Sequence, residues 1–200
     1  MTGLATPSTL GDNRSSRVPG EPGMWFFILG DLLVFAYMFA VFLAYRADHS
    51  EIFASSQRNL SVGVGVIYTM LLLTSSMFIV RATSLMRAGD RERAPRYVLM
   101  AMACGMAFAA IKVSEYSNKV HAGITLNTND FYLFYFFLTG MHLAHVLLGL
   151  AVLTAMWFLA RRAGTPSMGN KMRYAEGFAC FWHMVDQLWL IIFPLLYLVH

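Results

Sequence analysis

Seven ionisable side chains interrupt long apolar stretches of this sequence, and their chemistry is the first thing to explain. Six of them form three pairs with a spacing of three residues, so each pair lies on one side of a helix. Placing such groups in an apolar medium is costly, so each is expected to be paired, neutral or functional. The seven are Asp31, Lys112, Glu115, His142, His145, His183 and Asp186.

Asp31 lies about two turns inside the first apolar stretch, where no residue on the same part of the helix can pair with it. Because desolvation disfavours a charged carboxylate, Asp31 is expected to be either protonated or held by another helix. Two interpretations follow. One is a hydrogen bond between helices that aligns them, and the other is a role linked to lipid head groups or to protons.

Lys112 and Glu115 lie at the far end of the third apolar stretch, where a lysine can extend toward the membrane surface, and an ion pair there is expected. The three histidines could instead ligate haem or a metal. Counted from the cytoplasmic helix ends, however, His145 is about 22 Å deep and His183 about 9 Å deep, so they do not share one level. This favours a structural network of histidines and carboxylates that includes Asp186.

The elements that position these residues follow from the composition. The chain has 200 residues, of which 58% are hydrophobic and 13% charged, whereas soluble domains are about a quarter charged. Apolar stretches of about 20 residues cross a bilayer as helices. We predict an all-α integral membrane protein with a flexible cytoplasmic tail at 1–23 and a membrane domain at 24–200. Its five spans are expected at about 24–45, 60–80, 97–116, 131–159 and 177–199.

The basic residues predict how the five spans are oriented. Cytoplasmic loops are enriched in Lys and Arg, and alternate loops here differ strongly. One side carries Arg14, Arg17, Arg81, Arg87, Arg91, Arg93, Arg96, Arg161, Arg162, Lys171 and Arg173; the other carries only Arg46, Arg58 and Lys119. We therefore expect a multi-pass membrane protein with the N-terminus inside and the C-terminus outside. Clusters this short between apolar stretches do not indicate nucleic-acid binding.

Two motifs in the last spans are specific enough to compare with a known family. The fifth span reads Cys180-Phe-Trp-His-Met-Val-Asp-Gln-Leu-Trp189, which resembles the W-H-x-V-D-x-x-W signature of haem–copper oxidase (cytochrome c oxidase) subunit III. The fourth reads Thr139-Gly-Met-His-Leu-Ala-His-Val-Leu-Leu-Gly149, similar to the T-G-x-H-x-x-H-V-x-x-G of that family. Glu115-Tyr116 resembles its E-Y pair, and Asp31 occupies the place of a carboxylate in its first shared helix. The signature positions include Trp182, Trp189, Gly140 and Gly149.

The resemblance implies the bacterial five-helix form, a multi-pass protein of the bacterial inner membrane, in a two-plus-three arrangement with a lipid cleft between the first two helices and the other three. It implies a non-catalytic subunit with no cofactor or metal of its own, which docks on catalytic subunit I, where haem and copper reside. It also implies bound phospholipid and support of assembly and of proton uptake by that partner. Asp31 becomes the lipid-cleft or proton-linked carboxylate, and Glu115, His142, His145, His183 and Asp186 the structural polar network.

Other functions remain open from the sequence. The residues around Asp31 look most like the subunit-III-like group associated with nitric oxide reductase, so an accessory subunit of that complex in denitrification is an alternative to an oxidase subunit. An independent membrane haem protein using His145 and His183 is an alternative of another class, and a transporter built around Asp31 is a third. No residue of the chain is a convincing catalyst.

Overall fold

The computed structural model describes residues 22–58, 60–164 and 168–198, and within them the chain is helical without strands. Five helices are long and apolar enough to cross a membrane, as predicted. They are α1 (Pro22–Asp48), α3 (Val62–Arg87), α4 (Ala94–His121), α5 (Asp130–Ala160) and α6 (Met168–Phe193). The predicted tail lies outside the described residues up to residue 21.

The helices run past the predicted spans at most of their ends. α3 continues to Arg87 and α6 begins at Met168, because polar turns outside the apolar stretches remain helical. One short element was not predicted: α2 (Ser50–Gln57) carries the chain across the end of the bundle, too short and polar to stand out in a hydropathy pattern. At the other end of the chain, Pro194 changes α6 into a wider π-helical turn, η1 (Pro194–Leu198).

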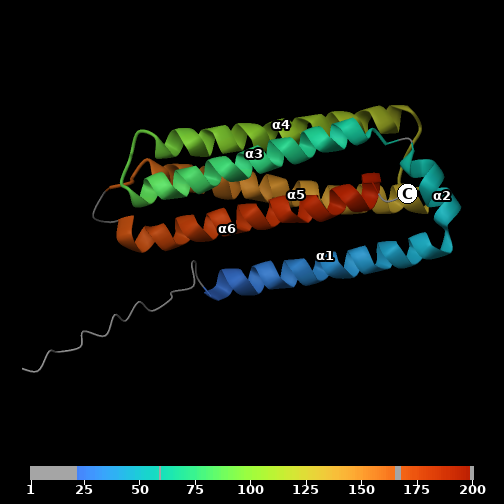
Figure 1. The fold of residues 1–200 in the computed structure, drawn as a ribbon, viewed down its shortest axis with the longest axis horizontal. Helices are drawn as coiled ribbons and strands as arrows, with labels where there is room; N and C mark the ends of the chain where they lie inside the picture. The colour runs from blue at the N-terminus through green and yellow to red at the C-terminus, as the bar shows by residue number, and fades with distance from the viewer. Residues whose placement is uncertain (1–21, 59, 165–167, 199–200) are drawn as a thin grey trace, which may run out of the picture.

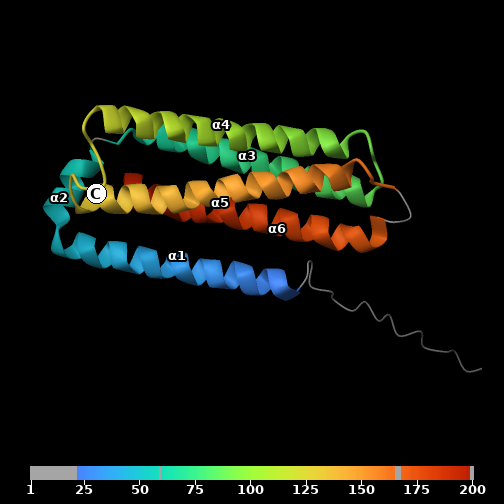
Figure 2. The ribbon, with the colours of Figure 1, turned by 180° about the vertical axis from the view of Figure 1, so that it is seen from behind.

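Four of the spans form a compact body and the first lies beside it (Figures 1 and 2). α3 packs along α4 and α6, and α5 also packs along α4 and α6, whereas α1 makes sparser contacts with α2, α5 and α6. The expected two-plus-three grouping is therefore wrong, because the second span belongs with the last three. A polar contact contributes to this packing, since the Ser75 hydroxyl of α3 donates to the Ala101 carbonyl of α4 at 3.0 Å.

Trp182 lies at the centre of the four-helix body, where glycines on two helices make room for its ring. A Cβ atom on Gly149 of α5 would lie 2.7 Å from the ring, and one on Gly105 of α4 would lie 2.8 Å from it. The Trp182 indole N–H donates to the Ser75 hydroxyl at 3.0 Å, which adds α3 to the contact. Gly140 has no such neighbour, since a Cβ there would come no nearer than 3.9 Å to the Tyr116 hydroxyl.

Candidate polar sites within the helix bundle

Asp31 of α1 pairs with His145 of α5. Both carboxylate oxygens lie 3.0 Å from His145 Nε2, and Oδ1 has the geometry of a hydrogen bond. The other ring nitrogen, Nδ1, is 2.7 Å from the Met141 carbonyl and so must carry a hydrogen to donate. The contact between Nε2 and Oδ1 is the hydrogen bond that ties α1 to α5.

Lys112 and Glu115 form the expected ion pair, with Nζ 3.0 Å from Oε2. The expectation that Lys112 extends toward the membrane surface is wrong, since its side chain is 0% exposed. The reason lies in the acceptors around it: Nζ also donates to the Tyr135 hydroxyl at 2.9 Å and to the Tyr197 hydroxyl at 3.3 Å. Glu115, Tyr135 and Tyr197 thus provide the three hydrogen-bond acceptors that water provides for an exposed lysine.

Tyrosines from four elements complete this buried site. The Glu115 carboxylate accepts hydrogen bonds from Tyr135 at 2.6 Å and Tyr68 at 2.8 Å, with a longer one from Tyr197. The Lys112 ammonium also lies 4.8 to 5.9 Å from five aromatic ring centres, close enough for cation–π attraction. Sequence reasoning missed the tyrosines. Their signal was a set of hydroxyl groups inside apolar spans, each of which needs a partner.

The remaining candidates do not join this site, although His183 and Asp186 both lie near Ser76. His142 is fully buried between the rings of Trp189 and Phe108, at 5.3 and 5.6 Å, and neither of its ring nitrogens has a hydrogen-bond partner within the described residues. His183 Nδ1 lies 2.6 Å from the Ser76 hydroxyl of α3. The Asp186 carboxylate is buried and accepts no hydrogen bond of normal geometry in that part of the chain, although Ser76 lies close enough to interact with it.

Of the five residues that we expected to form one polar network, His183 and Asp186 share the neighbour Ser76 in the described chain, and the others make contacts elsewhere in the bundle. Among Glu115, His142, His145, His183 and Asp186, no member bonds to another within the described chain. His142 and His145 are neighbours on α5 but meet different helices, one facing α4 and α6 and the other α1. In the same described residues, no group of three or more His, Cys, Asp or Glu side chains is placed to hold a metal ion.

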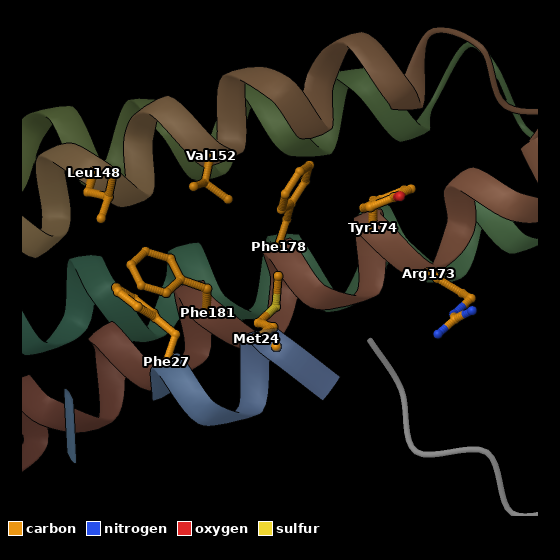
Figure 3. A pocket seen from close by; sticks show the side chains of 9 residues that line it. Met24, Phe27, Leu148, Val152, Arg173, Tyr174, Phe178 and Phe181 are labelled. Atoms are coloured by element: carbon orange, nitrogen blue, oxygen red, sulfur yellow. The ribbon is translucent and has the colours of Figure 1, made fainter. Parts of the chain in front are cut away.

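An apolar pocket of about 320 Å³ opens between α1, α5 and α6 (Figure 3). Figure 3 shows side chains of the three helices converging on it, with Arg173 at one end. Asp31 is not part of its lining. The pocket is lined by Gly23, Met24, Phe27, Leu148, Val152, Arg173, Tyr174, Phe178 and Phe181. An apolar interior with one basic residue at the end is suited to a hydrocarbon chain that carries an anionic group.

Comparison with known proteins gives consistent matches over nearly the whole chain. The family described as cytochrome c oxidase subunit III matches residues 11–200. The cytochrome c oxidase subunit 3 of Bacillus sp. (strain PS3) is 29% identical over 180 residues, which cover 88% of this chain and 84% of the relative. The quinol oxidase subunit 3 of Bacillus subtilis (strain 168) is 27% identical over 178 residues, with 88% and 85% covered. The cytochrome c oxidase subunit 3 of Thermostichus vulcanus is 27% identical over 177 residues, with 88% and 86% covered.

Proposed function

Because the chain belongs to the cytochrome c oxidase subunit III family, we propose that it is the non-catalytic subunit III of a haem–copper respiratory oxidase and supports the catalytic subunit from within the membrane. The observation that carries this proposal is the family match from residue 11 to residue 200. Membership implies a complex with catalytic subunit I, and the five apolar helices make the chain a multi-pass membrane protein.

The geometry of the polar residues supports a non-catalytic role. Asp31 with His145 and His183 with Ser76 each join two helices. The Lys112–Glu115 pair lies within α4 and is joined to other elements by its hydrogen bonds with Tyr68, Tyr135 and Tyr197. A catalytic centre instead needs its reactive groups to converge on a space that a substrate can enter. Both ring nitrogens of His145 are engaged, one by the Met141 carbonyl and the other by Asp31, which argues against haem ligation by His145 together with His183.

We further propose that the arginine-rich end of the bundle faces the cytoplasm of a bacterial cell and that the C-terminus lies outside. This end is defined by Arg87 and Arg161 at the ends of α3 and α5, and by the α3–α4 turn that carries Arg91 and Arg93. The support is the excess of basic residues at one end, which follows the charge bias of cytoplasmic loops.

We propose that the α1–α5–α6 pocket binds a phospholipid chain, with Arg173 near the phosphate. The support is its apolar lining, its volume and the placement of one basic side chain at its end. Val152→Trp should fill the pocket and reduce the lipid that copurifies with the complex. Val113→Trp, on an exposed position of α4, is the matched control and should leave that lipid in place.

Copurification tests the main proposal. A tagged chain purified in mild detergent should bring down a haem-containing catalytic subunit, and the separated chain should show no haem absorption of its own. A stable solitary chain without that partner would contradict the proposal, and a Soret band lost on His183→Ala would favour the independent haem protein.

A functional test separates the finer parts of the proposal. Removal of the chain should slow proton uptake and shorten the working life of the remaining oxidase.

We propose that oxygen rather than nitric oxide is the substrate of the complex, because the relatives compared above are named as oxidase subunits. Their names include both cytochrome c and quinol oxidases, so the electron donor is decided by assaying the purified complex with each donor in turn.

A further inference from the structure

A second, polar pocket of about 360 Å³ lies at the arginine-rich end, between the start of α4 and the end of α5. We call it the arginine pocket and define it by four of its lining residues: Arg91, Arg96, Trp157 and Arg161. It is separate from the α1–α5–α6 pocket and shares none of its residues. The family resemblance assigned no role to any of these four side chains.

Two arginines of the arginine pocket have no ion-pair partner within the described residues. Elsewhere at this end, Arg87 pairs with Glu176 at 2.9 Å, and Arg93 lies 3.7 Å from Asp90. Arg96 and Arg161, in contrast, have no carboxylate partner in the described residues. The pocket therefore concentrates exposed positive charge that is available to an anion.

One acidic residue, Glu92, also lines the arginine pocket and reduces this charge. Three arginines against one carboxylate still leave the pocket with a net positive charge. Glu92 makes no ion pair with the three arginines within the described chain, so it does not neutralise any of them directly. It offers a variant that should act in the opposite direction to loss of an arginine.

The pocket walls are held in place by the backbone around them. The Arg91 Nε–H donates to the Ala163 carbonyl, which ties the α3–α4 turn to the end of α5. Gly89 and Gly164, both with positive φ, touch beside this bond, and a Cβ on Gly164 would lie 2.9 Å from the Gly89 carbonyl oxygen. The Arg161 guanidinium lies 4.8 Å from the Trp157 ring centre, in a cation–π contact that orients it. The turn at Arg91 and the Arg161 guanidinium are thus held in place, whereas Arg96 is an exposed side chain at the open rim of the pocket.

The charged and the apolar residues of the arginine pocket lie at different depths along the bundle. Leu99 and Trp157 lie about one helical turn deeper in the bundle than the arginines that precede or follow them, Arg96 and Arg161. The Trp157 indole N–H is buried without an acceptor in the described residues. A charged rim, an apolar inner wall and a spare donor are the features expected where a lipid phosphate meets the start of its acyl chains.

We propose that the arginine pocket binds the phosphate head group of an anionic phospholipid. The phosphate accepts charged hydrogen bonds from Arg96 and Arg161, while the chains of the lipid follow Leu99 and Trp157 toward the membrane interior. This site goes beyond the proposed function, which places a lipid only between α1, α5 and α6, and it depends on that proposal only for the membrane setting.

The test uses the complete complex, delipidated in detergent and then offered phosphatidylglycerol and phosphatidylcholine in equal amounts. Native mass spectrometry counts the lipids retained. Arg96→Gln with Arg161→Gln should weaken phosphatidylglycerol binding by about twentyfold or more, at about a fivefold loss for each arginine. Glu92→Gln should strengthen binding severalfold, and added salt should weaken it.

Arg81→Gln with Arg93→Gln is the matched control, because it removes the same charge at the same end without touching the pocket. Equal retention of phosphatidylglycerol by the control and pocket variants would overturn the proposal. So would its displacement by inorganic phosphate at similar concentration, which would indicate a soluble anion site. Loss of the catalytic subunit with unchanged lipid would indicate a protein contact instead.

The same preparations separate this proposal from the earlier ones. Copurification of the catalytic subunit is scored in every variant, and Val152→Trp reports on the α1–α5–α6 pocket alone. If the arginine variants keep their lipid while Val152→Trp loses it, the arginine pocket is refuted and the earlier lipid proposal stands.

Discussion

Replacing Glu115 with glutamine should destabilise the protein strongly, because it leaves the Lys112 ammonium in the core without a counter-charge. The Lys112 side chain is 0% exposed, and its other acceptors are the hydroxyl groups of Tyr135 and Tyr197. Removing one member of a buried ion pair costs about 3–5 kcal/mol. The glutamine oxygen can still accept from the tyrosines, so most of the loss comes from the unpaired lysine.

Lys112→Met should cost less than Glu115→Gln. The Glu115 side chain is 18% exposed, and its carboxylate would still accept hydrogen bonds from Tyr68 and Tyr135. A carboxylate that keeps these donors loses one charged bond, so we expect a cost of about 1–3 kcal/mol. The two members of the same pair are therefore unequal, and the structure gives the direction of the inequality.

The double variant gives the sharpest result, because the effect of Lys112→Met should change sign. In the wild-type background it destabilises, whereas in the Glu115→Gln background it removes the unpaired charge and should restore stability. The free energy of unfolding can be measured by titrating the full chain in mild detergent with sodium dodecyl sulfate, followed by the fluorescence of Trp182 and Trp189. Additive losses in the double variant, or a larger loss for Lys112→Met than for Glu115→Gln, would refute the reasoning.

Three further changes test other parts of the bundle. His145→Ala removes the hydrogen bond to Asp31, so the free energy of local opening of α1, measured by amide hydrogen exchange, should fall by about 1–3 kcal/mol while that of α4 is unchanged. An equal change in both helices would refute this. Gly149→Ala forces a Cβ to 2.7 Å from the Trp182 ring and should cost about 1–3 kcal/mol in detergent unfolding, whereas Gly140→Ala should be tolerated; equal losses would contradict the packing. Asp186→Asn should leave the unfolding free energy unchanged or higher, since no hydrogen bond in the described chain supports the carboxylate, and a clear loss would show a missed partner.

The number and order of the spans could be predicted because length and apolarity alone decide whether a helix crosses a bilayer. Helix ends were less predictable, since the turns beyond the apolar stretch stay helical for reasons unrelated to hydropathy. The grouping of the helices came from the family resemblance and was wrong. The observed grouping depends on which helix faces pack together and on contacts between them such as Ser75 with Ala101, and the periodicity of the sequence does not reveal these partners.

The partners of the polar residues could not be predicted from spacing. His142 and His145 are three residues apart, which places them only about 60° apart around the helix axis. This small angle is enough to direct the two side chains to different helices, because α5 has neighbours on several sides. His142 contacts α4 and α6, whereas His145 contacts α1. Lys112 shows the same limit: its depth predicted a side chain that reaches the membrane surface, but Glu115 on its own helix and hydroxyl acceptors on two other elements, α5 and η1, hold it inside.

The buried polar groups differ in what they contribute to stability, and this difference bears on function. Lys112 and Glu115 satisfy one another and the tyrosines around them, so their presence is explained within the chain. His142 and Asp186 are buried at comparable depth without hydrogen bonds in the described residues, and such groups cost free energy rather than supply it. Both lie next to the signature tryptophan Trp189, one by ring contact and the other three positions earlier on α6. His142 and Asp186 therefore reduce the stability of the bundle beside Trp189. Buried polar groups without partners occur mainly at functional sites, so these two residues mark the surroundings of Trp189 as a functional region.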